Sequence, residues 1–126
     1  KNGRIYEAHA SSNEQLLKAV LDTDENARYL GEAALVPFSS PINQTGLLFY
    51  DTLYDENACC HLAFGFGFPI SLPNGNQLNE KELLKAHINQ SKTHIDFMIG
   101  TKDLNIIATT RDGQKVPIFK NGNWVK

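Results

Sequence analysis

The stretch "THIDFMIG", residues 93–100, has the alternating pattern of a β-strand. Side chains alternate across a strand, so residues two apart point the same way. His94 and Asp96 therefore share one face of the strand, and Ile95 and Phe97 share the other. An imidazole beside a carboxylate suits a divalent cation such as Zn²⁺, Co²⁺ or Mn²⁺. A hydrogen-bonded histidine inside the core fits the same pattern, so spacing alone leaves both interpretations open.

Four further segments have strand patterns. They are "EAALVPF" (32–38), "LNIIATT" (104–110), "VPIFK" (116–120) and "NWVK" (123–126). Turn signals stand at Asp112-Gly113 and Asn121-Gly122. "RIYEAHA" (4–10) also alternates, directly after a hairpin signal at Asn2-Gly3. A hairpin turn there lacks its first strand, so we expect a larger protein with the partner strand upstream; a frayed start is the alternative.

Helical patterns cover residues 11–22, 23–31 and 79–87. Their predicted caps are a Ser12–Gln15 capping box, Thr23 with a closing Gly31, and an Asn79–Glu82 pair. We expect a loop at 39–46 and a turn at Asn74-Gly75, whereas 47–69 is too apolar to assign. The pattern predicts one α+β domain over residues 1–126, with a mixed, largely antiparallel sheet and two or three helices.

The composition limits the function classes. The formal net charge is −2 without a basic cluster, which argues against nucleic acid or an anionic membrane as the main partner. No apolar run approaches the roughly 18 residues of a membrane span. Cys59 and Cys60 are adjacent, which strains a mutual disulfide, so we predict two reduced thiols in a cytoplasmic protein.

Five side chains are candidates for chemistry: Glu32, Glu56, His61, His94 and Asp96. Each also has a simpler explanation, because isolated glutamates are usually solvated and isolated histidines usually lie hydrogen-bonded in a core. His9 and His87 lie in polar or amphipathic surroundings and are predicted at the surface. The sequence contains no phosphate-binding glycine loop, G-x-S-x-G or H-E-x-x-H motif.

Four blocks in order resemble the C-terminal part of the M29 metallo-aminopeptidases, the aminopeptidase T and aminopeptidase S group. They are "GEAALVPFSSPI" (31–42), "LFYDTLYDENACCHLAFG" (48–65), "THIDFMIG" (93–100) and "VPIFKNGNW" (116–124). The resemblance implies a cytoplasmic, homodimeric exopeptidase that removes N-terminal residues from peptides. It also implies two divalent metal ions, which would be Zn, Co, Mn or Mg.

The resemblance also assigns roles to residues. Glu32 matches a metal-site carboxylate, expected to bridge the ions or to shuttle a proton. His61, His94 and Asp96 match metal ligands, and Glu56 matches the family's active-site region.

Two departures from the family stand out. The family's first metal-binding Glu lies upstream of any position in this sequence, so we expect the 126-residue chain by itself to be inactive. The family's active-site Tyr, seven residues after the His matched by His61, corresponds to Phe68, which has no hydroxyl. A catalytically inert remnant that serves in binding or dimerisation is therefore an alternative, and an unrelated small α+β binding domain is a third.

Overall fold

The computed structural model describes residues 2–126. The chain forms two compact units. The first contains the described residues up to 33 together with residues 62–96, and the second contains residues 34–61 and 97–126. The prediction that residues 1–126 are one domain stays a prediction.

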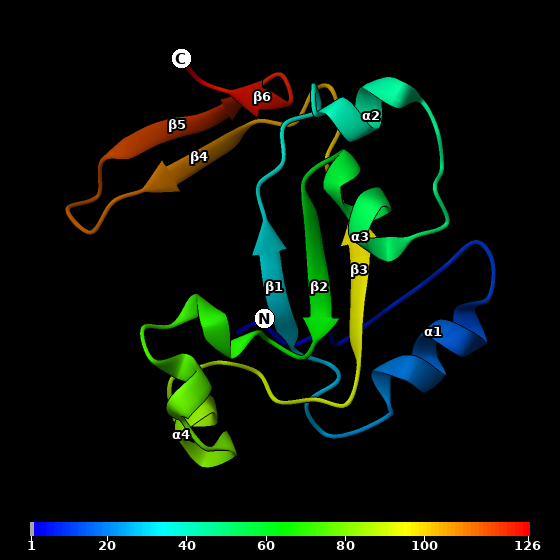
Figure 1. Ribbon diagram of the computed structural model, residues 1–126, viewed down its shortest axis with the longest axis vertical. Helices are drawn as coiled ribbons and strands as arrows, with labels where there is room; N and C mark the ends of the chain where they lie inside the picture. The colour runs from blue at the N-terminus through cyan, green and yellow to red at the C-terminus, as the bar shows by residue number, and fades with distance from the viewer. Residues whose placement is uncertain (1) are drawn as a thin grey trace. The chain divides into compact units, whose positions relative to one another are not determined.

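A three-stranded sheet runs through the first unit. Its strands are β1 (Leu30–Ala34), β2 (His61–Gly65) and β3 (His94–Met98), in the order β1-β2-β3. Neighbouring strands run in opposite directions (Figure 1). The predicted strand at 93–100 is confirmed, and the strand predicted at 32–38 begins earlier and ends at Ala34. The strand predicted at 4–10 is wrong, because it is reduced to one bridge between Arg4 and Tyr29.

Two α-helices belong to the first unit: α1 (Glu14–Leu21) and α4 (Glu80–Lys85). At α4 the predicted capping box is confirmed, since the Asn79 side chain accepts from the Glu82 amide and the Glu82 carboxylate accepts from the Asn79 amide. The capping box predicted at Ser12 is wrong. Helix α1 starts later, after a left-handed Asn13 that makes no side-chain cap.

The helix predicted at 23–31 is also wrong, because these residues form turns that lead into β1. The Asp24 carboxylate accepts hydrogen bonds from the Asn26 amide (2.9 Å), the Ser91 hydroxyl (2.9 Å) and the Lys92 amide (2.8 Å). Thr23 therefore caps no helix, and Gly31 lies inside β1 rather than ending a helix. Contacts with residues far along the chain outweigh the local helical pattern here.

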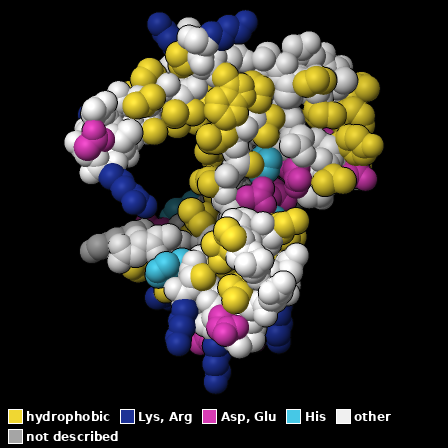
Figure 2. Space-filling model, turned by 60° about the vertical axis from the view of Figure 1, so that its left-hand side comes forward, with side chains coloured by type: hydrophobic (Ala, Val, Ile, Leu, Met, Phe, Trp, Pro, Cys, Tyr) yellow, Lys and Arg dark blue, Asp and Glu magenta, His cyan; other side chains and the backbone are white. Residues whose placement is uncertain are grey.

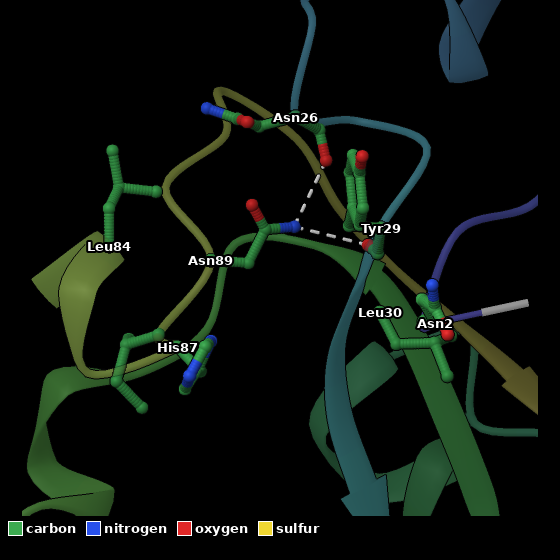
Figure 3. Close-up of a pocket in the computed structure, with 9 residues that line it drawn as sticks. Asn2, Asn26, Tyr29, Leu30, Leu84, His87 and Asn89 are labelled. Atoms are coloured by element: carbon green, nitrogen blue, oxygen red, sulfur yellow. Dashed lines mark hydrogen bonds between the residues drawn. The ribbon is translucent and has the colours of Figure 1, made fainter.

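The first unit also contains two short 3₁₀-helices, η2 (Pro69–Ser71) and η3 (Gly75–Gln77). The predicted turn is present, with Asn74 in the left-handed conformation before η3. A pocket of about 410 Å³ lies in this unit, lined among others by Tyr29, Leu84, His87 and Asn89 (Figure 3).

The second unit carries an antiparallel sheet in the order β4-β5-β6. Its strands are β4 (Ile106–Thr109), β5 (Lys115–Lys120) and β6 (Asn123–Trp124), with Thr109 opposite Lys115 and Phe119 opposite Trp124. Both predicted turns are confirmed by left-handed backbone at Gly113, Asn121 and Gly122. The α+β fold class is confirmed, with the strands divided between two antiparallel sheets.

The second unit also contains three short helices, which come before β2 in the sequence. They are α2 (Pro41–Thr45), α3 (Thr52–Asp55) and the 3₁₀-helix η1 (Glu56–Ala58). Helix α2 lies in the predicted loop, so that prediction is wrong. The Ser40 hydroxyl accepts from the Asn43 amide at 3.1 Å, Pro41 starts the helix, and a left-handed Gly46 ends it.

Each unit has a small apolar core. In the first, Leu21, Ala27, Ala63, Phe64 and Leu83 are buried, and in the second Cys59, Cys60 and Phe119 are buried. Both cysteines are free thiols, as predicted. Many hydrophobic side chains nevertheless lie at the surface (Figure 2), such as Leu47, Tyr50 and Leu53 in the second unit.

Candidate metal centre

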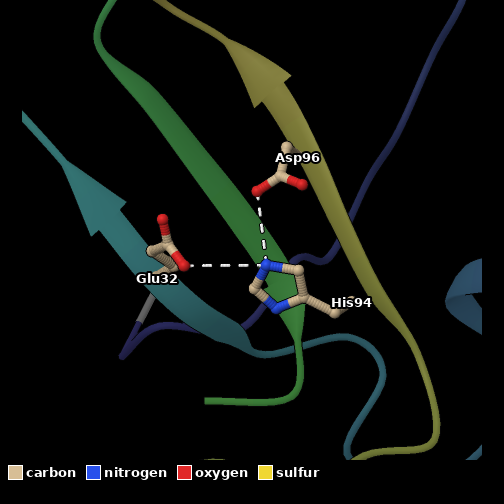
Figure 4. Close-up of side chains that lie close together, drawn as sticks. All are labelled: Glu32, His94 and Asp96. Atoms are coloured by element: carbon tan, nitrogen blue, oxygen red, sulfur yellow. Dashed lines mark ion pairs between the residues drawn. The ribbon is translucent and has the colours of Figure 1, made fainter. Parts of the chain in front are cut away.

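Three predicted ligands converge on one face of the first sheet. Glu32 comes from β1, and His94 and Asp96 come from β3 (Figure 4). The Nε2 atom of His94 lies 3.3 Å from Oδ1 of Asp96 and 3.6 Å from Oε2 of Glu32. Each residue offers one ligand atom, and all three atoms lie within 4.8 Å of one another. The structure therefore brings together residues that are up to 64 positions apart in the sequence.

A backbone contact fixes the tautomer of His94. Its Nδ1 lies 2.7 Å from the carbonyl oxygen of Phe66. A carbonyl only accepts hydrogen bonds, so we assign the proton to Nδ1, which leaves a lone pair on Nε2 in the neutral ring. That lone pair faces the two carboxylates. An imidazole held by a carbonyl through its other nitrogen is the usual arrangement of a metal-ligating histidine.

Asp96 is the most buried member of the cluster. Its side chain is 6% exposed, compared with 21% for His94 and 28% for Glu32. Among the described residues, Oδ1 of Asp96 has no hydrogen-bond partner. A buried carboxylate oxygen without a hydrogen-bond partner is costly unless a cation lies beside it. The donor set of one imidazole and two carboxylates therefore fits a divalent metal ion.

Close backbone packing holds the two ligand-bearing strands beside the end of β2. A Cβ atom on Gly31 would lie 2.4 Å from the carbonyl oxygens of Gly65 and Phe66. A Cβ atom on Gly65, whose φ is +99°, would lie 2.1 Å from the Thr93 carbonyl oxygen. Gly31 precedes Glu32 and Thr93 precedes His94, so the absence of side chains at the two glycines sets the separation between the ligands.

The ring of Phe68 packs against this cluster. Its centroid lies 5.0 Å from that of the His94 imidazole, edge to face, and 5.4 Å from that of Phe66. The side chain is 48% exposed. The position predicted to replace the family's active-site Tyr thus lies beside a candidate ligand.

Glu56 and His61 lie in the second unit. Glu56 begins η1, and His61 begins β2 and is only 2% exposed. The Nδ1 atom of His61 lies 3.1 Å from the Cys59 carbonyl oxygen, so its Nε2 also carries the lone pair in the neutral ring. This is the same backbone arrangement as at His94. Their roles as metal ligands stay predictions.

The other two histidines lie at the surface, as predicted. His9 has a side chain that is 76% exposed and approaches Glu14. His87 follows α4, is exposed and has a left-handed backbone. Neither belongs to a cluster of ligand atoms in the described part of the chain.

Comparison with known proteins identifies the family. The family model for the thermophilic metalloproteases (M29) matches residues 1–124. The chain belongs to the M29 family. It is 52% identical to aminopeptidase AmpS of Bacillus subtilis over 98% of its own length, and 43% identical to aminopeptidase T of Thermus aquaticus over 99%. The solved structure of AmpT from Thermus thermophilus superposes with a TM-score of 0.82 at 40% identity, and the match covers 98% of this chain.

The M29 chain spans about 30% of the length of each of these relatives. Among residues 2–126, no helix is long and apolar enough to cross a membrane.

Sequence reasoning missed two features that lie near the candidate site. The first is the Phe66 carbonyl, since a backbone acceptor leaves no signal in the residue types. The second is Asn89, whose side chain binds three backbone carbonyls near the end of β2. An asparagine shortly after a helix is so common that its presence in the sequence indicates only a turn.

Proposed function

We propose that this M29 chain forms part of a metal-dependent aminopeptidase that hydrolyses N-terminal residues from peptides. One observation carries the proposal: the buried Oδ1 of Asp96 lies 3.3 Å from His94 Nε2, with Oε2 of Glu32 3.6 Å from the same nitrogen. Relatives that are named aminopeptidases, at 41–52% identity, support the reaction class.

Glu32, His94 and Asp96 would hold one divalent ion. Glu56 and His61 are proposed as ligands of a second, on the strength of the family resemblance and of the backbone bond that orients His61. When bound, such ions lower the pKa of a coordinated water and polarise a carbonyl. Imidazole and carboxylate donors favour Zn²⁺, Co²⁺ or Mn²⁺ over Mg²⁺.

The carboxylates of this chain would have different roles in the reaction. Asp96 has the most buried side chain of the three, so it would act as an anionic ligand in a defined position. Glu32 is the most exposed of the three, which lets its second oxygen reach the substrate side and carry a proton to the leaving amine. The free α-amino group of the peptide is a cation, and the negative charge of this cluster favours its approach.

A second candidate function is a catalytically inert module that binds or dimerises. Phe68 supports this alternative, because its ring lies at the site without the hydroxyl that the family's Tyr would offer to the transition state. Localisation in the cytoplasm, assembly as a homodimer and inactivity of the 126-residue chain by itself stay predictions.

The test compares wild type with Asp96→Asn, His94→Ala and the surface control His87→Ala in the protein at its natural length. Metal content is measured after dialysis against Zn²⁺ or Co²⁺, and hydrolysis is followed with a leucyl chromogenic substrate. We expect the first two variants to lose at least one ion and on the order of a hundredfold in rate, with the control unchanged. Equal metal affinity in all four proteins would contradict the metal site, and metal binding without hydrolysis by wild type would favour the inert module.

A further inference from the structure

We propose that Asn89 is a positioning residue for the metal centre: it orients the imidazole of His94 through the backbone of Phe66. The inference rests on the proposed function, because it concerns how His94 presents Nε2 to a metal ion. Asn89 lies in the segment between α4 and β3 and is outside the cluster of ligand atoms.

The side chain of Asn89 ties three pieces of chain together. Its Nδ2 lies 3.0 Å from the Asn26 carbonyl oxygen, 3.1 Å from that of Tyr29 and 2.5 Å from that of Gly65 (Figure 3 draws the first two). A carboxamide has two N–H donors, so at least one of them is shared between two carbonyls. One side chain thus links the turn before β1 to the end of β2.

The backbone of Asn89 makes a second link to the same place. Its carbonyl accepts from the Gly67 amide at 2.8 Å. Asn89 therefore holds Gly65 with its side chain and Gly67 with its backbone, one on each side of Phe66. The Phe66 amide donates to the Thr93 carbonyl at 2.6 Å, which ties the same segment to the residue before His94.

These bonds set the direction of the Phe66 carbonyl, which is the acceptor for His94 Nδ1. If the carbonyl turned away, Nδ1 would lose its partner, and the imidazole would be free to rotate. Rotation of the ring would turn Nε2 away from Asp96 and Glu32. The chain of contacts from Asn89 through Phe66 to His94 therefore sets the direction in which Nε2 points.

The hydrogen bonds of Asn89 described above join it to backbone groups of the chain. Its side chain lines the pocket of about 410 Å³ with Leu30, Leu84 and His87, and none of the three cluster residues lines that pocket. Asn89 would therefore affect the site through the backbone of residues 65–67, which carries the Phe66 carbonyl. Residues that orient a metal ligand through hydrogen bonds typically change metal affinity by 10- to 100-fold.

The experiment compares Asn89→Ala with Asn26→Ala in the full protein. Asn26 is a matched control, because it lies in the wall of the same pocket and donates one side-chain hydrogen bond, to the Gln90 carbonyl at 2.8 Å, without holding Gly65 or Gly67. Two quantities are measured: the contact between His94 Nδ1 and the Phe66 carbonyl, from crystal structures of the metal-free variants, and the dissociation constant for Zn²⁺, from calorimetry. Thermal unfolding of each variant reports stability separately.

We expect wild type and Asn26→Ala to keep the contact between His94 Nδ1 and the Phe66 carbonyl, and Asn89→Ala to lose it, with Zn²⁺ affinity lowered about tenfold. An Asn89→Ala protein that is less stable but has the same contact and the same affinity would overturn the inference and leave a purely structural role. If Asn89→Ala does not fold, Asn89→Ser, which keeps a side-chain donor, is measured instead by the same criteria. Failure of wild type to bind Zn²⁺ would refute the proposed metal site, while the orientation of the His94 ring would still test the role of Asn89.

Discussion

The ring of Phe68 lies edge to face against the imidazole of His94, at 63° between the planes. This contact places an aromatic side chain beside a candidate ligand of the metal centre. A Phe ring offers no hydroxyl there. The family resemblance predicts a Tyr at this position, so the predicted difference is one oxygen atom.

Phe68→Tyr is predicted to raise the rate of aminoacyl hydrolysis. A transition-state hydrogen bond is worth on the order of 2–4 kcal/mol in a dry site. Because Phe68 is 48% exposed, we expect the lower end, about a thirtyfold rise in kcat, with unchanged metal content. Phe66→Tyr is the control, since its ring packs on Phe68. Equal rates for Phe68→Tyr and wild type would show that another group supplies the donor.

Asp96→Asn is predicted to have opposite effects on stability without and with metal. In the presence of a chelator, the variant removes a buried charge with an unpartnered oxygen, so the free energy of unfolding should rise by about 1 kcal/mol. With saturating Zn²⁺, wild type gains stability from ligand binding and the variant gains much less. Urea unfolding under both conditions measures this. Asp103→Asn, at an exposed turn, is the control and should change neither value.

Asp24 is predicted to contribute to acid sensitivity. The backbone amide of Lys92, and after it the Ser91 hydroxyl and nearby amides, hold the pKa of this carboxyl below its ordinary value. A lowered folded-state pKa means that the stabilisation is complete above the unfolded-state pKa, about 3.9, and is lost as the pH falls through the folded-state value. Asp24→Asn should therefore lower stability by about 1 kcal/mol at pH 7 and converge with wild type in strong acid.

The control for this prediction is Asp22→Asn. Asp22 forms an exposed ion pair with Arg28 at 2.7 Å, and such pairs contribute little. Thermal unfolding from pH 2 to pH 7 distinguishes the two variants. An Asp24→Asn curve parallel to that of wild type across the whole range would contradict the assignment.

Both cysteines are predicted to be unreactive in the folded protein. Cys59 is 7% exposed and Cys60 1%, burial raises the pKa of the Cys59 thiol, and the Cys60 thiol lies 3.2 Å from the Val36 carbonyl oxygen. Thiolate is the reactive form, so labelling by a disulfide reagent at pH 7 should be slowed on the order of a hundredfold relative to protein in urea. Single Cys→Ala variants assign the two rates. Stoichiometric labelling of native protein within minutes would rule out this protection.

Local signals in the sequence predicted some elements well. The capping pair Asn79–Glu82 acts within one turn, and the alternation of residues 93–100 is a property of one strand, so both are found in the structure. The same alternation did not indicate which face is buried. The face with Asp96 is the buried one, while Ile95 and Phe97 are 43% and 37% exposed.

Other features depend on contacts that no local pattern records. Helix α2 has five residues, too few for a periodic pattern, and was predicted as a loop. Residues 23–31 have a helical pattern, but Asp24 binds Ser91 and Lys92, more than 60 positions away. The meeting of Glu32 with His94 depends on strand order and register. Strand spacing in the sequence placed His94 and Asp96 together as possible ligands. The role of Glu32 at the same metal site came from the family resemblance.

The close approach at Gly31 and Gly65 has a consequence for interpreting natural variants. An alanine at Gly31 would push β1 away from the end of β2 and take Glu32 with it. A displacement of about 1 Å at a reacting group can cost on the order of a hundredfold in rate. In a saturation-mutagenesis map, both glycines would then tolerate substitution as poorly as the ligands do, although neither has a functional side chain. Alleles at these two positions are best classified with active-site lesions, even when the encoded protein folds and every ligand is intact.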